Sequence, residues 1–175
     1  MNTVMNISKR FSFVLLLLIA TSSAVAAQEL VTREGDFTAG GGFSFGTNVS
    51  YTGGSESGIT LQGYYGITDE IRAGAGFTFY LIGEDNISAS EFNIDGHYIF
   101  TNEDGLVLYG LAGLNFSRVS VDTGGFGSIS VSDTGLNLGG GVEYSLGEVF
   151  LFGEPKLTVG GFDQFNLTGG IRLRF

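Results

Sequence analysis

Nine ionisable residues of the sequence are candidates for a site with chemistry. All nine stand in segments where every second residue is apolar. Acidic pairs in such an arrangement could act as general acid and base. The four acidic and four basic members balance in charge, which favours a network of ion pairs because an unpaired buried charge is costly. We therefore predict a charge network in a closed interior. Its members are Arg72, Glu91, Asp95, His97, Glu143, Glu154, Lys156, Arg172 and Arg174.

His97 is the only histidine of the sequence. A deacylase-like arrangement would need a serine two residues later on the same strand face, and Ile99 stands there. We interpret His97 as a hydrogen-bonded interior residue beside Asp95, and we expect no enzyme activity. Arg118 is left out of the network, because Leu114 and Phe116 on its face are apolar and a loop is near.

The remaining motifs predict neither a cofactor nor a metal. Glycine clusters at 40–42, 139–141 and 169–170 resemble phosphate loops, but no Lys-Ser/Thr pair or helix follows them. Loop acids such as Glu84 and Asp122 lack the regular spacing of a calcium site. The sequence has no cysteine, which excludes thiol catalysis and Cys-ligated metal centres.

Residues 1–27 are predicted to be a secretory signal peptide. Lys9 and Arg10 precede an apolar core at 11–20, and Ala24-Val25-Ala26 supplies small residues for cleavage. The core is shorter than the about 20 residues of a membrane-spanning helix. Residues 28–175 are then expected to form a single domain.

Composition limits the classes of partner and of fold. The formal net charge is −10, from 8 basic and 18 acidic residues. Since Lys9 and Arg10 lie in the leader, the mature chain has a net charge of −12, which argues against nucleic-acid binding. The 30 glycines disfavour a helix-rich fold.

The mature chain alternates apolar and polar residues, which is typical of β-strands. In 59–67, for example, Ile59, Leu61, Tyr65 and Ile67 share one face. The pattern predicts an all-β protein, an eight-stranded antiparallel up-and-down transmembrane β-barrel. The eight predicted segments are 36–46, 58–67, 71–82, 87–100, 106–121, 131–146, 149–159 and 164–175.

The polar faces carry mostly small residues, which fit the interior of a narrow barrel. The apolar faces then contact lipid, and in lipid the first and eighth strands must pair because no edge can stay open. The excess acidic residues fall in turns, loops and the stretch 28–36. Short turns at 68–70, 101–105 and 146–148 are expected on the periplasmic side together with both termini, and the outer loops are expected to be short.

The end of the chain carries a family resemblance in Thr168, Gly170, Leu173 and Phe175. A polar residue, a glycine two positions later and hydrophobic residues five and seven positions later resemble the C-terminal signal of outer-membrane proteins. With the leader and the eight segments, the chain resembles the small outer-membrane β-barrel family typified by the OmpA transmembrane domain and OmpX. The resemblance implies a bacterial outer-membrane location, a monomer, contact with lipid and lipopolysaccharide, and recognition of these four residues by the outer-membrane assembly machinery.

These observations favour a structural role in envelope integrity. A narrow channel for ions or small solutes remains an alternative, since the interior glycines leave room for water. A surface ligand-binding module is a second alternative, for which the short loops offer little area. A soluble barrel of the lipocalin type is disfavoured, because the sequence has no tryptophan for a Gly-x-Trp feature.

Overall fold

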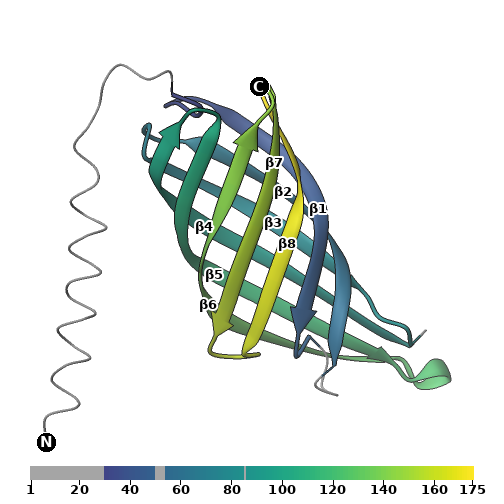
Figure 1. Cartoon of the computed structure of the whole chain (residues 1–175). Helices are drawn as coiled ribbons and strands as arrows, with labels where there is room; N and C mark the ends of the chain where they lie inside the picture. The colour runs from purple at the N-terminus through teal and green to yellow at the C-terminus, as the bar shows by residue number, and fades with distance from the viewer. Residues whose placement is uncertain (1–29, 50–53, 85) are drawn as a thin grey trace, which may run out of the picture.

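A computed structural model describes residues 30–49, 54–84 and 86–175 as a closed barrel of eight antiparallel strands (Figure 1). Each strand pairs with the next, and β1 pairs with β8. No helix in these residues is long and apolar enough to cross a membrane. The predicted eight-stranded antiparallel up-and-down barrel is confirmed. Its elements are β1 (Phe37–Thr47), β2 (Ser55–Gly66), β3 (Ile71–Leu81), β4 (Ile87–Glu103), β5 (Leu106–Asp122), the 3-10 helix η1 (Gly124–Phe126), β6 (Ser128–Ser145), β7 (Val149–Val159) and β8 (Gln164–Arg174).

The barrel places polar residues inside and apolar residues outside. In β4, Asn93 and Asp95 are buried, whereas Phe92 and Ile94 are 43% and 47% exposed. Successive side chains of a strand point to opposite faces, so the alternating sequence produces this arrangement directly. The outer surface is therefore suited to hydrocarbon and not to water.

Glycines allow the first and last strands to approach closely. Gly42 of β1 faces Gly170 of β8 in the register of the two strands. A Cβ atom on Gly42 would lie 2.2 Å from the backbone oxygen of Gly169, and one on Gly170 would lie 2.2 Å from that of Gly41. Only glycine fits such a contact, so these positions permit the curvature that closes a narrow barrel.

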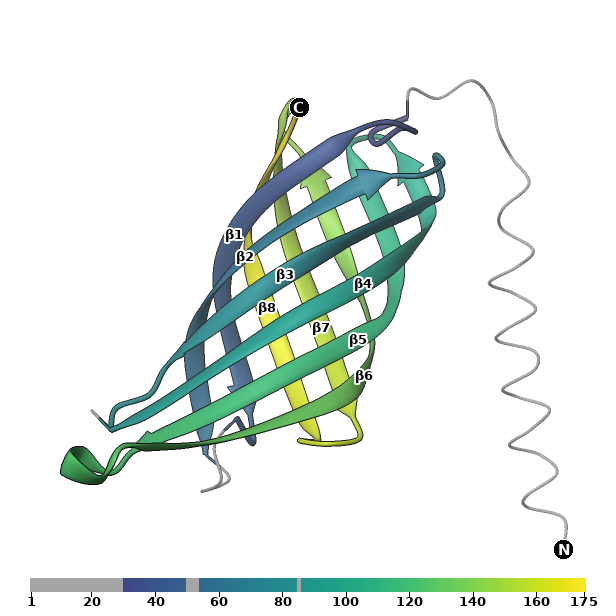
Figure 2. The ribbon, with the colours of Figure 1, turned by 180° about the vertical axis from the view of Figure 1, so that it is seen from behind.

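Three strands are longer than the others, and two of them, β5 and β6, form a hairpin that projects at one end of the barrel. β4, β5 and β6 have 17, 17 and 18 residues, against 11 or 12 for the rest. Residues Ser128–Gly135 of β6 pair with β5 alone, because β7 joins only at Leu136. Figures 1 and 2 show the β5–β6 hairpin projecting there, with η1 at its tip. We call this end the outer end, and the end that carries Phe175 the inner end.

The strands are longer than predicted at both ends of the barrel. β6 begins at Ser128 instead of Val131, in the projecting hairpin, and β4 ends at Glu103 instead of Phe100, at the inner end, where Glu103 pairs with Leu106. In β6 the alternate serines Ser128 and Ser130 are exposed, and their polarity resembles that of a loop. The connection between β5 and β6 is short, as predicted, but the strands carry it further from the barrel than the sequence indicated.

A segment before β1 covers the inner end of the barrel. We call residues 30–36 the N-terminal strap. Val31 and Thr32 are buried, and their backbone N–H groups both donate to Asn102 Oδ1 at 2.9 Å. Asn102 Nδ2 donates in turn to the backbone oxygen of Thr32 at 2.7 Å. The sequence predicted that part of the excess acid falls in this stretch, and Glu34 is exposed, but it did not predict that Val31 and Thr32 pack into the inner mouth.

We expect the mature protein in SDS to migrate differently before and after boiling. Below the projecting hairpin every strand is paired on both sides, so the barrel offers no sheet edge there at which unfolding can begin, and the unheated protein resists the detergent. Gel mobility of an outer-membrane extract measures the shift. Identical migration, with the protein recovered from the soluble periplasm, would contradict the transmembrane barrel.

The strap should detach when Asn102 is replaced by alanine. Asn102→Ala removes the three hydrogen bonds to the strap and leaves two buried N–H groups unpaired, at a cost of about 1–3 kcal/mol each. Hydrogen–deuterium exchange should then accelerate in the peptide covering 30–36 while the strands stay protected. The matched control is the exposed neighbour in Glu103→Ala, for which we expect unchanged exchange. Equal exchange in both variants would refute the role of Asn102.

Candidate functional site

The predicted charged residues come from five strands, and strand alternation brings most of them into the interior. Eight of the nine are more than nine-tenths buried. Arg174 is the exception, because it ends β8 at the inner mouth, where its side chain is 30% exposed. It donates to the Val31 backbone oxygen at 2.6 Å and lies 3.8 Å from Asp36. The buried members are Arg72 (β3), Glu91, Asp95 and His97 (β4), Glu143 (β6), Glu154 and Lys156 (β7), and Arg172 (β8).

The centre of the site is Glu143, which two arginines approach from strands across the barrel. Arg72 Nη1 and Nη2 donate to the two carboxylate oxygens at 2.9 and 2.6 Å. Arg172 Nη1 donates to Glu143 Oε1, and its Nη2 donates to Glu154 Oε2 at 3.0 Å. Charge-assisted and bidentate pairs are the strong form of hydrogen bond. The four residues therefore link β3, β6, β7 and β8 through the interior.

Two tyrosines enclose these ion pairs. The Arg172 guanidinium lies 4.9 Å from the ring centroid of Tyr64, and that of Arg72 lies 4.7 Å from the centroid of Tyr109. The Tyr109 hydroxyl donates to Glu154 Oε2 at 2.6 Å. The aromatic faces stabilise the guanidinium groups where water is excluded.

His97 is held between the same two tyrosines. Its ring centroid lies 4.3 Å from each, and the contact with Tyr109 is a parallel stack. Arg72 Nε donates to His97 Nδ1 at 3.0 Å. The sequence prediction placed His97 beside Asp95, but the hydrogen-bond partner is Arg72, because a side chain two positions along the strand is less accessible than one from a neighbouring strand.

A second charged group lies next to the first. Lys156 Nζ donates to Asp95 Oδ2 at 3.2 Å, and Asn137 Nδ2 donates to Asp95 Oδ1 at 2.8 Å. Asn137 also donates to Asn93 Oδ1 at 2.8 Å. This asparagine bridge connects β4, β6 and β7 and satisfies the polar atoms that the ion pair leaves free.

Glu91 has no basic partner among the described residues. Its carboxylate accepts from the hydroxyl of Tyr80 at 3.0 Å and from the side-chain amides of Asn115 and Gln164. Arg174 lies outside the buried set, so the interior holds three basic and four acidic side chains. The predicted balance of four against four is therefore not met inside the barrel, where neutral donors take the place of the fourth cation.

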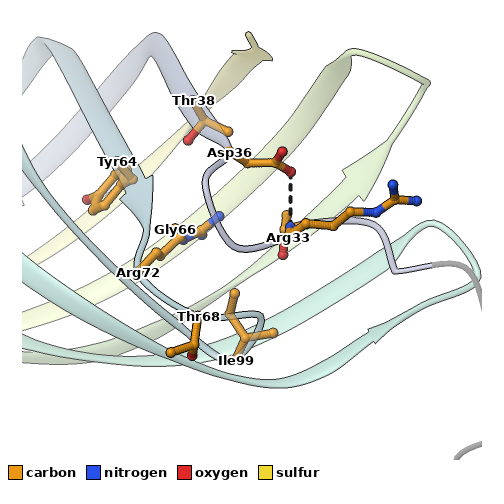
Figure 3. Close-up of a pocket in the computed structure, with 9 residues that line it drawn as sticks. Arg33, Asp36, Thr38, Tyr64, Gly66, Thr68, Arg72 and Ile99 are labelled. Atoms are coloured by element: carbon orange, nitrogen blue, oxygen red, sulfur yellow. Dashed lines mark hydrogen bonds between the residues drawn. The ribbon is translucent and has the colours of Figure 1, made fainter.

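Apolar residues close both ends of this polar interior. The inner cap contains Val31 from the strap, and the outer cap contains Val49 and Tyr80. Each cap borders a hollow of about 10 Å³, which is scarcely the volume that holds one water molecule. Figure 3 shows residues that line the inner hollow, with Ile99 of the inner cap among them. The inner cap is Val31, Ile99, Val107, Tyr109, Leu111 and Phe150, and the outer cap is Val49, Tyr80, Ala89 and Val119 with Ile82, Ile87 and Phe162.

The sequence pattern did not predict the two caps or the interior position of Tyr109. In 106–112 both faces of β5 are apolar, so alternation alone does not identify Tyr109 and Leu111 as interior residues. The loss of polar residues from the inward face near the end of β5 was the sequence signal that could have indicated the inner cap. No group of three or more His, Cys, Asp or Glu that could hold a metal occurs in the described part of the chain.

The four residues of the C-terminal signal lie on opposite faces of β8 and its end. Thr168 is buried and its hydroxyl is 2.7 Å from that of Ser44, while Gly170 forms part of the closure with β1. Leu173 and Phe175 are exposed on the outside. The Phe175 ring centroid lies 6.1 Å from that of Phe37.

Comparisons with known proteins agree with this geometry. The family model described as "Outer membrane protein beta-barrel domain" matches residues 13–170. Among solved structures, the N-terminal β-barrel domain of Pseudomonas aeruginosa OprF superposes with a TM-score of 0.63 at 17% identity, over 82% of this chain and 98% of that one. Neisserial surface protein A gives a TM-score of 0.62 at 21% identity, over 80% and 96%.

A third similar structure is Ail, the attachment invasion locus protein of Yersinia pestis, with a TM-score of 0.59 at 18% identity over 81% of this chain and 99% of that one. At these identities the structures support the fold alone. A search of the curated proteins finds no match. The predicted bacterial outer-membrane location is confirmed by the family match. This chain belongs to the family of outer-membrane protein β-barrel domains.

Proposed function

We propose that this protein is a closed, non-conducting element of the outer membrane that contributes to envelope integrity and contacts lipopolysaccharide. The main observation that supports this role is the pairing of Glu143 with both Arg72 and Arg172 across the interior. These bonds occupy the axis of a barrel whose eight strands leave room for little more than side chains. The apolar caps at both ends add to the closure.

A narrow ion channel is the second candidate, and the polar interior favours it. A water-filled path would have to displace Arg172 from both Glu143 and Glu154. Breaking buried ion pairs leaves uncompensated charges, so an open state would be rare unless new partners replace the old ones.

A surface ligand-binding role has one supporting feature, the projecting β5–β6 hairpin. A structure of the similar Ail protein holds the heparin analogue sucrose octasulfate. On the present chain the outer end carries exposed acids such as Glu84 and Asp122, which repel a soluble polyanion. We therefore place this role behind the structural one.

We propose that the protein has no catalytic activity. Tyr64 and Tyr109 cover both faces of the His97 ring, and the position two residues along holds Ile99, which belongs to the inner cap. A substrate would have to displace the caps to reach this histidine.

The C-terminal residues are proposed to serve assembly, and the barrel is proposed to be a monomer. Phe175 is 73% exposed at the inner end, where the periplasmic face is expected, so its ring is accessible to an assembly protein. Thr168 and Gly170 have structural contacts within the barrel that do not depend on such recognition.

The purified protein should give no steady conductance in a planar lipid bilayer. The interior ion pairs and both caps would have to open before ions could pass. The charge-reversal variant Arg172→Glu places a third carboxylate beside those of Glu143 and Glu154. The repulsion should open the interior and create conducting events. Two results together would establish the channel instead: reproducible conductance of the wild-type protein, and a reversal of its preference between cations and anions in Arg172→Glu.

Neutralising the central carboxylate should destabilise the barrel. Glu143→Gln leaves Arg72 and Arg172 close together without their shared counter-charge, and loss of one partner of a buried ion pair costs about 3–5 kcal/mol. Urea unfolding in lipid vesicles measures the free energy of unfolding. The control Glu148→Gln lies in an exposed turn and should change it by less than about 0.5 kcal/mol. Equal stability of the two variants would show that the network does not hold the barrel together.

A further inference from the structure

One arginine lies outside the interior network, on the lipid-facing side of β5. The outward positions of this strand are apolar from Leu106 to Phe116 and change to Arg118 at the next outward position. A strand that rises about 3.4 Å per residue and tilts about 45° climbs roughly 24 Å from Leu106 to Phe116, close to the roughly 25 Å of a lipid-facing band. Arg118 is therefore the first side chain above the hydrocarbon, at the depth of the headgroups.

On the neighbouring strands β4 and β6, the outward residues are also polar in the row of Arg118. Phe92 and Phe116 pair across β4 and β5 with ring centroids 6.3 Å apart, and they are the last large apolar residues on the outward faces of these two strands. In the next outward row Arg118 stands between Ser90 and Ser132. The row above holds Ser88, Ser120 and Ser130, also in register.

The arginine is exposed and lacks an acidic partner in the described chain. Its Nη2 donates to Ser130 Oγ at 3.2 Å, and the hydroxyls of Ser120 and Ser130 lie 2.8 Å apart. None of the carboxylates in residues 30–49, 54–84 and 86–175 forms an ion pair with it. The site thus offers one guanidinium and a set of hydroxyl donors whose hydrogen-bonding capacity is largely unused.

The distribution of charge points to an anion held by the membrane. Of the basic residues that the structure describes, Arg118 alone lies toward the outer end, since the others are in the interior or near the inner mouth. Beyond it lie acids, for example Asp122 at the end of β5 and Asp163 in the loop before β8, which oppose the approach of a soluble polyanion. A phosphate anchored in the outer leaflet is already at the depth of Arg118 and does not have to pass these acids.

We propose that Arg118 and the surrounding serines bind the phosphate of an outer-leaflet lipid headgroup, with the chemistry of lipid A. Arginine binds phosphate oxygens through paired N–H groups, and the serine hydroxyls donate to the oxygens that remain. Phe92 and Phe116 below contact the acyl chains. This inference rests on the proposed contact with lipopolysaccharide and assigns that contact to a place.

Native mass spectrometry of the protein released from detergent micelles tests the assignment. The probes are diphosphorylated lipid A and the same lipid after enzymatic removal of its phosphates. Wild-type protein should retain the phosphorylated lipid preferentially. Arg118→Gln should reduce that retention about tenfold, as expected for the loss of one charge-assisted contact, and Arg118→Lys should keep part of it. Arg33→Gln removes a charge from an exposed residue at the inner mouth and should have no effect.

The outcomes separate this inference from the proposed function. Retention by wild type that Arg118→Gln does not change would overturn the assignment to Arg118, and the contact with lipopolysaccharide would stand. Absence of any preference for the phosphorylated lipid in wild type would remove that contact as well. Displacement of the lipid by an equal concentration of inorganic phosphate would contradict a lipid site. Each variant is first checked for the heat-dependent gel shift, so that misfolding is not read as lost binding.

Discussion

The structure depends on the pairing of β1 with β8. Hydrocarbon cannot hydrogen-bond a free strand edge, so every backbone group within the membrane must find a partner in the sheet. With eight strands this closure gives a small radius, and the strands must bend and approach closely to reach it. The facing glycines Gly42 and Gly170 are placed where a side chain would meet the opposite backbone. The glycine content of the sequence is thus a requirement of the closed sheet.

The narrow interior that results imposes a second requirement. Side chains must fill it, and polar side chains in it must satisfy one another. The chain meets this with ion pairs around Glu143, asparagine bridges around Asp95 and neutral donors around Glu91. The caps then keep water from both ends of these groups. The bonds that tie the strands together also occupy the path that a solute would take, so the proposed impermeability has the same cause as the stability.

Alternation and glycine content were enough to predict the architecture. The eight segments, their antiparallel order and the burial of Arg72, Glu143 and Arg172 follow from a period of two residues, which any strand imposes. Strand ends were less accurate, because Ser128 and Ser130 continue a strand with residues that are also common in loops.

The partners inside the barrel could not be predicted in the same way. Which residues meet across the interior depends on the stagger between strands and on the reach of long side chains, and neither is visible in the spacing of one strand. His97 was expected beside Asp95 and instead bonds Arg72 from the neighbouring strand. The strap was missed because nothing in 30–36 alternates, and its position depends on the distant Asn102.

The projecting β5–β6 hairpin has a consequence for how the protein enters the membrane. If the inner end faces the periplasm, the tip of the β5–β6 hairpin must cross the hydrocarbon before the barrel is complete. Carrying a charged side chain through the bilayer centre costs about 2.5–3.5 kcal/mol on insertion scales. Residues 123–132, between Asp122 and Asp133, include no charged side chain and consist mainly of glycine and serine with isolated apolar residues. The tip of this hairpin thus adds no charged side chain of its own to the cost of translocation.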